Sequence, residues 1–144
     1  MKKTLYVSDL DGTLLDRNSC LSEESISTLN YLINECGVNF TIATARTPAT
    51  VVGIMERVNT QLPFIVMNGA ATWDNSGRRF ISTSPFDNYT IEKVCNIFEA
   101  HGLNPMVYRR NGNSIEVHHC GQFSSQEQEF VEERKRLHKT FHLN

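Results

Sequence analysis

The sequence predicts an α/β fold built on an open, mainly parallel sheet. Over residues 5–70, short β-prone runs alternate with segments of helical periodicity. Each helical segment is long enough to cross back over a sheet, so consecutive strands should run parallel with right-handed crossovers. The composition, 40% hydrophobic and 21% charged, is that of a globular protein.

Three apolar runs are the expected parallel strands. They span residues 5–7, 38–43 and 64–67. The first run ends at Asp9 and breaks at Gly12, as a buried strand followed by a loop should. A ligand pocket is then expected at the carboxyl ends of the strands.

Two helices are expected between these strands. Ser22 precedes two acidic residues that suit a helix N-terminus, and apolar residues recur at helical spacing up to Gly37. Thr47 and Pro48 resemble an N-cap followed by proline at the first helical position. Each helix should pack one apolar face on the sheet.

The pattern changes after residue 70. Residues 71–81 predict an antiparallel hairpin, and the stretch from Ser82 to Pro85 is the best domain boundary, giving domains of residues 1–84 and 85–144. Beyond this boundary we expect a helix that ends near Gly102, a hairpin that turns at Asn111 and Gly112, and a charged helix over residues 124–139.

Charge and cysteine usage exclude several classes of protein. The net charge of -2 gives no long-range reason to expect nucleic acid or an anionic membrane as a partner. The four cysteines are far apart and read as free thiols. The N-terminus predicts neither a signal peptide nor a membrane-spanning segment, so we expect a cytoplasmic protein.

The chemistry is expected where the first strand ends. Asp9 and Asp11 are two residues apart and should face one pocket, while Leu10 turns into the core. Two close carboxylates repel each other unless a cation or a shared proton relieves them, and oxygen ligands suit magnesium. An ordinary Asp- and Gly-rich turn is the alternative interpretation.

Polar residues at the other two strand ends favour a phosphate site over a simple turn. Thr44 and Arg46 follow the second strand, and Asn68 and Gly69 follow the third. The planar fork of an arginine suits phosphate oxygens, although a surface ion pair is the alternative role for Arg46.

These segments resemble motifs of a known superfamily. Residues 7–15 resemble the first motif of the haloacid dehalogenase superfamily, and residues 43–46 resemble its second motif in the Cof-like sugar-phosphatase branch. Ala45 replaces the glycine that is commoner there, and residues 67–70 also resemble that branch. The resemblance implies a partial Rossmann-like parallel sheet in residues 1–84 and the start of an α+β cap in residues 85–144.

The resemblance also implies an activity and roles for residues. It implies a magnesium-dependent phosphomonoester hydrolase that acts on a small phosphorylated metabolite, such as a sugar phosphate. Asp9 would form an aspartyl-phosphate, and Asp11 would serve as acid and base with its main-chain carbonyl on the magnesium, so that both residues bind the metal. The remaining site residues would contact the phosphoryl group or the substrate; these are Thr44, Arg46, Asn68 and Gly69.

Two features of the superfamily have no counterpart here, namely a charge-neutralising lysine and a later acidic loop on the metal. We therefore expect a chain that resembles only the N-terminal part of the family and is inactive alone. The first strand would have an open edge, which favours self-association. The alternative is a non-catalytic, truncated relative that acts by association or ligand binding. A third interpretation is a phospho-accepting signalling receiver, which the Asp-x-Asp-Gly-Thr loop and the cap-like second half disfavour.

Overall fold

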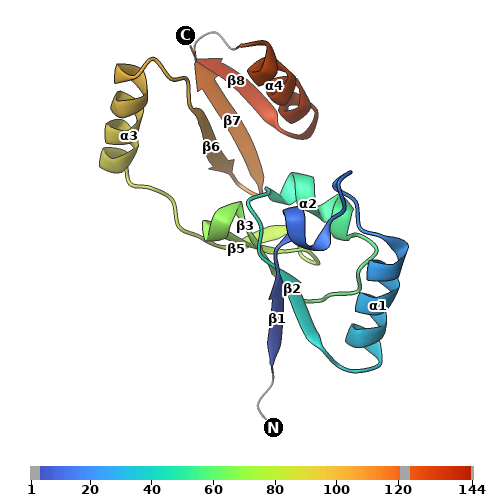
Figure 1. Ribbon diagram of the computed structural model, residues 1–144. Helices are drawn as coiled ribbons and strands as arrows, with labels where there is room; N and C mark the ends of the chain where they lie inside the picture. Colours follow the sequence, from blue (N-terminus) through green and yellow to red (C-terminus); the bar gives the residue numbers. More distant parts are fainter. Residues whose placement is uncertain (1–3, 121–123, 144) are drawn as a thin grey trace. The chain divides into compact units, whose positions relative to one another are not determined.

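The computed structural model describes residues 4–120 and 124–143, which form two compact units divided between Ser84 and Pro85 (Figure 1). The interpretation of these units as part of a catalytic core and part of a cap stays a prediction.

A parallel pair of strands begins the first unit. Strand β1 (Leu5–Ser8) pairs with β2 (Asn39–Ile42), with Leu5 opposite Asn39. Strand β3 (Phe64–Val66) runs parallel to β2, to which a single bridge between Ala43 and Ile65 connects it. The predicted α/β fold with parallel strands is thus confirmed.

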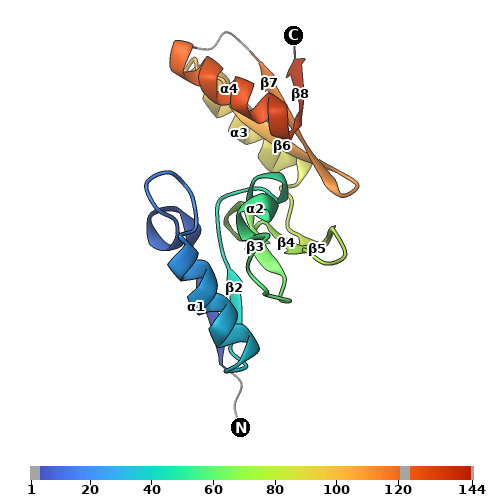
Figure 2. The same ribbon diagram turned by 90° about the vertical axis from the view of Figure 1, so that its right-hand side faces the viewer.

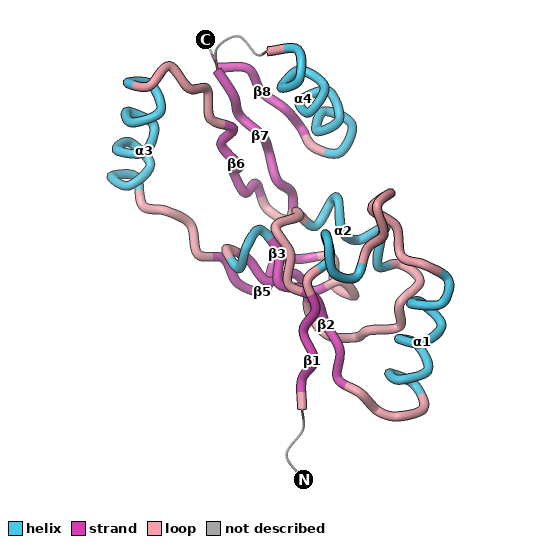
Figure 3. Tube along the Cα trace, viewed as in Figure 1, coloured by secondary structure: helices cyan, strands magenta, loops and turns pink. Residues whose placement is uncertain are grey.

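An antiparallel hairpin completes the first unit, as predicted (Figure 3). Strand β4 (Ala71–Asp74) pairs with both β3 and β5 (Arg79–Thr83). Across the hairpin, the rings of Trp73 and Phe80 meet edge to face with their centroids 4.9 Å apart.

Two helices connect the parallel strands. Helix α1 (Glu23–Asn34) begins where predicted, because the Ser22 hydroxyl accepts a hydrogen bond from the Ser25 amide at 3.0 Å. Helix α2 (Pro48–Met55) begins at its proline, but the preceding Thr47 does not cap a backbone amide with its side chain. Figure 2 shows α1 alongside β2.

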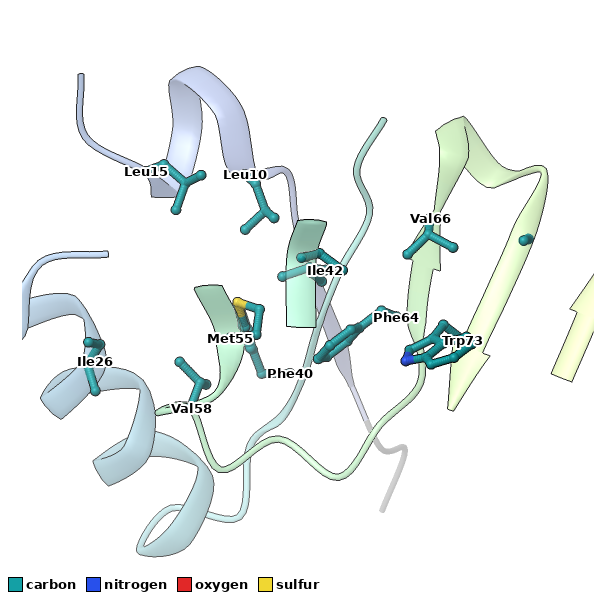
Figure 4. Packing of buried hydrophobic residues seen from close by; sticks show 12 residues of the cluster. Leu10, Leu15, Ile26, Phe40, Ile42, Met55, Val58, Phe64, Val66 and Trp73 are labelled. Atoms are coloured by element: carbon teal, nitrogen blue, oxygen red, sulfur yellow. The ribbon is translucent and has the colours of Figure 1, made fainter. Parts of the chain in front are cut away.

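The core of the first unit is one cluster of buried apolar side chains (Figure 4). Residues from both helices, from β2 to β4 and from the turn after β1 contribute to it. The cluster consists of Leu10, Leu15, Ile26, Phe40, Ile42, Val51, Met55, Val58, Phe64, Val66, Ala71 and Trp73. Burial of the apolar surface of these side chains is the main contribution to the stability of the unit.

Strand β1 is not the buried strand that the sequence predicts. Leu5 is 54% exposed and Tyr6 is 56% exposed. The reason is its position, because β1 is an edge strand that pairs only with β2 within the described residues.

The second unit is a three-stranded sheet with two helices. Its elements are α3 (Asn88–Ala100), β6 (Met106–Asn111), β7 (Ser114–Cys120), α4 (Ser125–Leu137) and β8 (Lys139–Leu143). The β6–β7 hairpin was predicted, but its two-residue turn is at Gly112 and Asn113, one residue later than expected, because Asn111 still pairs with Ser114. Strand β8 was not predicted and pairs in parallel with β7. The described helices include none that is long and apolar enough to cross a membrane.

Candidate active site

Three backbone hydrogen bonds bring the ends of β1, β2 and β3 to one edge of the first unit. The Ala43 amide donates to the Ser8 carbonyl at 2.9 Å, and the Thr44 amide donates to the Ile65 carbonyl at 3.0 Å. The Asn68 amide then donates to the Thr44 carbonyl at 3.0 Å. The residues that follow the three strands are therefore neighbours in space.

The turn after β1 exposes two carboxylates on either side of a buried leucine. Asp9 and Asp11 are exposed, while Leu10 is completely buried, as the sequence predicts. The Leu10 amide donates to Oδ1 of Asp9 at 2.8 Å and orients that carboxylate. Gly12 has a φ of 76°, a conformation that disfavours any residue with a side chain.

Asp11 and Arg46 form a bidentate ion pair. Arg46 Nε donates to Oδ2 of Asp11 at 2.8 Å, and Nη2 donates to Oδ1 at 2.7 Å. These hydrogen bonds lower the pKa of the Asp11 carboxyl, burial opposes the shift, and the positive charge of Arg46 adds to it. Arg46 is therefore in an ion pair, which was the alternative interpretation of this residue. Its partner, Asp11, is itself a predicted site residue.

Thr44, two residues before Arg46, is only 4% exposed. Its hydroxyl oxygen accepts a hydrogen bond from the Arg46 amide at 3.2 Å. Since the hydroxyl is the acceptor in this bond, its own proton can be donated to another oxygen.

A left-handed turn over residues 67–69 carries the third group of predicted site residues. Met67, Asn68 and Gly69 have φ angles of 54°, 55° and 86°. Sequence reasoning missed the strained conformation of Met67, because methionine carries no signal for positive φ. The Met67 amide donates to the Arg46 carbonyl at 3.0 Å, which ties this turn to the loop after β2.

The residues at this edge fit magnesium only in part. The exposed Asp9 carboxylate and the Asp11 main-chain carbonyl are hard oxygen donors of the kind that Mg²⁺ prefers. The Asp11 carboxylate, in contrast, is engaged by Arg46. Within residues 4–120 and 124–143, no group of three or more His, Cys, Asp or Glu side chains is arranged to hold a metal ion.

Comparison with known protein sequences gives a consistent result. The family model described as haloacid dehalogenase-like hydrolase matches residues 6–143. A protein of Mycoplasma pneumoniae named "Putative phosphatase" is 32% identical in an alignment of 120 positions that covers 72% of this chain and 41% of that protein.

Solved structures share the fold. A haloacid dehalogenase-like hydrolase from Bacteroides thetaiotaomicron superposes with a TM-score of 0.72 at 18% identity, over 99% of this chain and 52% of that one. The HAD subclass IIB sugar phosphatase BT4131 gives a TM-score of 0.69 at 17% identity, over 99% and 53%. The chain thus spans about half the length of these structures.

Proposed function

Because this chain belongs to the family of haloacid dehalogenase-like hydrolases, we propose that it carries the nucleophile side of a magnesium-dependent phosphomonoester hydrolase site. The observation that carries the proposal is the backbone hydrogen bonding that brings Thr44, Asn68 and Ser8, the residue before Asp9, to one edge. The names of two similar proteins, a "Putative phosphatase" and a sugar phosphatase, support a small phosphorylated metabolite, such as a sugar phosphate, as the substrate.

Asp9 is the nucleophile in this proposal. The hydrogen bond from the Leu10 amide holds Oδ1 of Asp9, so that Oδ2 is the oxygen that attacks phosphorus. The bond from phosphorus to the ester oxygen breaks, and an aspartyl-phosphate forms. This intermediate divides one difficult displacement into two easier steps.

The other residues of the edge serve the two steps. Asp11, once it has taken up a proton from solvent, gives that proton to the leaving alcohol and then takes one from the attacking water. The buried Thr44 hydroxyl donates to a phosphoryl oxygen, and Arg46 and Asn68 bind the phosphate or the substrate. Magnesium held by Asp9 and the Asp11 carbonyl would neutralise phosphate charge.

Phosphoryl transfer to Asp9 can be tested directly. The protein is incubated with ³²P-labelled acetyl phosphate and magnesium, quenched in acid and treated with hydroxylamine, which cleaves acyl phosphates. We expect hydroxylamine-sensitive label to accumulate slowly on the wild type, at a rate that a radioactive assay detects even when turnover is negligible, and none on Asp9→Asn, because an amide is not a nucleophile. Phosphate release from p-nitrophenyl phosphate, where measurable, should disappear in the same variant.

The matched control is Asp74→Asn, which changes the carboxylate at the end of β4 in the same unit. This variant should be labelled like the wild type. Equal labelling of Asp9→Asn and the wild type would contradict the assignment of Asp9.

A further inference from the structure

The ion pair between Asp11 and Arg46 joins two residues that the proposed reaction needs separately. Arg46 donates to both carboxylate oxygens of Asp11, at 2.8 and 2.7 Å. Each Asp11 oxygen thus already accepts a hydrogen bond from a cation, which makes the carboxylate a poor acceptor of the proton that it must pass to a leaving alcohol or take from water. We infer that Arg46 is a positioning residue. It holds Asp11 in the free protein and releases it when its side chain rotates, so that the guanidinium binds the substrate phosphate instead. This inference rests on the proposed function and adds an order of events to it.

The backbone of Arg46 is held on both sides, which leaves its side chain as the part that can move. Its amide donates to the Thr44 hydroxyl at 3.2 Å, and its carbonyl accepts from the Met67 amide at 3.0 Å. Both contacts lie at the edge where the phosphate is proposed to bind. A rotation of the side chain alone can therefore move the guanidinium from Asp11 to a phosphate at this edge.

Phosphate is a suitable competitor for the guanidinium. Its oxygens match the same planar fork, and a phosphate monoester carries nearly two negative charges at neutral pH, against one on the carboxylate. The pair is also partly open to solvent, with side-chain exposures of 25% for Arg46 and 51% for Asp11. Ion pairs that are open to water are weak, so the exchange has a small cost.

The exchange predicts coupling between Asp11 and Arg46 in phosphate binding. Inorganic phosphate is titrated calorimetrically, at constant magnesium concentration, into the wild type, Asp11→Asn, Arg46→Gln and the double variant. Removing the competing carboxylate should tighten phosphate binding about two- to fivefold. Removing the guanidinium should weaken it roughly tenfold or more.

The decisive result is the double variant. If Asp11 competes for Arg46, the gain from Asp11→Asn disappears when Arg46 is already glutamine. If Asp11→Asn acts only by removing a negative charge, the gain in phosphate affinity should persist when Arg46 is glutamine. Asp9→Asn, measured with Arg46 and with glutamine at position 46, shows how large this general effect of charge is. Arg57→Gln breaks another bidentate arginine pair of the first unit, with Glu23, and should leave the phosphate affinity unchanged.

Circular dichroism shows whether each variant is folded. If Arg46→Gln does not fold, Arg46→Lys takes its place, since lysine keeps the charge and loses the fork. If Asp11→Asn raised the phosphate affinity equally in the wild type and in the Arg46 variant, the proposed movement of Arg46 from Asp11 to phosphate would be wrong. Absence of phosphate binding in every variant would also overturn it, and labelling of Asp9 decides separately whether the proposed function stands.

Discussion

At the residue scale, a single apolar side chain positions the two carboxylates of the candidate site. Leu10 is fully buried in the core of the first unit (Figure 4). Its neighbours Asp9 and Asp11 are exposed. The packing of Leu10 therefore sets where the turn after β1 lies. A change of this leucine should affect both stability and the site.

We expect Leu10→Ala to lower the free energy of unfolding by about 2 to 5 kcal/mol, because it leaves a cavity in a packed core. Urea unfolding followed by tryptophan fluorescence measures this, since Trp73 belongs to the same cluster. The matched control is Leu5→Ala, which changes an exposed leucine of β1 and should cost far less. Equal losses in the two variants would contradict the role of Leu10.

Magnesium should bind weakly to residues 1–144. One carboxylate and one carbonyl supply little protein charge, and Mg²⁺ gives up its water reluctantly. Calorimetric titration with magnesium chloride checks this expectation. Tight binding at one ion per chain would reveal a ligand that the proposed site lacks.

At the element scale, helix α3 begins at an aspartate cap whose contribution depends on pH. The Asp87 carboxylate accepts a hydrogen bond from the Thr90 amide at 2.7 Å, and this bond is the main cause of its lowered pKa. A carboxyl whose pKa is lower in the folded than in the unfolded state stabilises the fold above the unfolded value, which is 3.8. The stabilisation is lost as the pH falls through the lower, folded pKa.

Comparison with Asp87→Asn tests this cap, because asparagine caps a helix without a charge. The stability of wild type relative to variant should be constant at neutral pH and should fall on acidification below 3.8. Denaturant unfolding monitored by circular dichroism at several pH values gives the comparison. A difference that grows on acidification would refute the cap.

Strand β1 is the second element with a testable consequence. Its Leu5, Tyr6 and Val7 side chains are exposed, and only β2 pairs with it among the described residues. An apolar strand with an open edge favours pairing with another copy of the chain. We therefore predict that residues 1–144 self-associate through β1.

Light scattering coupled to size exclusion would show this association. Tyr6→Lys should reduce it, because a charge on an edge strand opposes pairing. Tyr31→Lys is the control, since Tyr31 is a similarly exposed tyrosine on helix α1 and not on a strand. A wild-type monomer at all concentrations would refute the association.

At the scale of the whole molecule, we expect negligible phosphatase turnover from residues 1–144 alone. Phosphoryl transfer depends on positioning and charge neutralisation, and no lysine contacts Asp9 within the part of the chain that the structure describes. Loss of one charge-stabilising group commonly costs about a hundredfold or more in rate. A malachite-green assay with sugar phosphates measures the turnover, and an ordinary enzymatic rate would contradict this expectation.

Local rules explain why most elements of the fold were predictable. Ser22 caps α1, and a two-residue turn that contains Gly112 joins β6 to β7, because capping and turn chemistry depend on a few neighbouring residues. Strand β8 was missed, since its short, mixed sequence becomes a strand only by pairing with β7.

The sequence by itself determined the succession of strands and helices as far as α4, the buried Leu10 between two aspartates, and the motifs that identify the family. The tertiary structure decided which groups meet. Arg46 is 35 residues from Asp11 along the chain, and no local pattern could show that it binds this carboxylate. It also decided that β1 is exposed, although its residues are apolar. The physical reason is that secondary structure follows from short-range sterics and hydrogen bonding, whereas ion-pair partners and burial depend on residues brought together from distant parts of the chain.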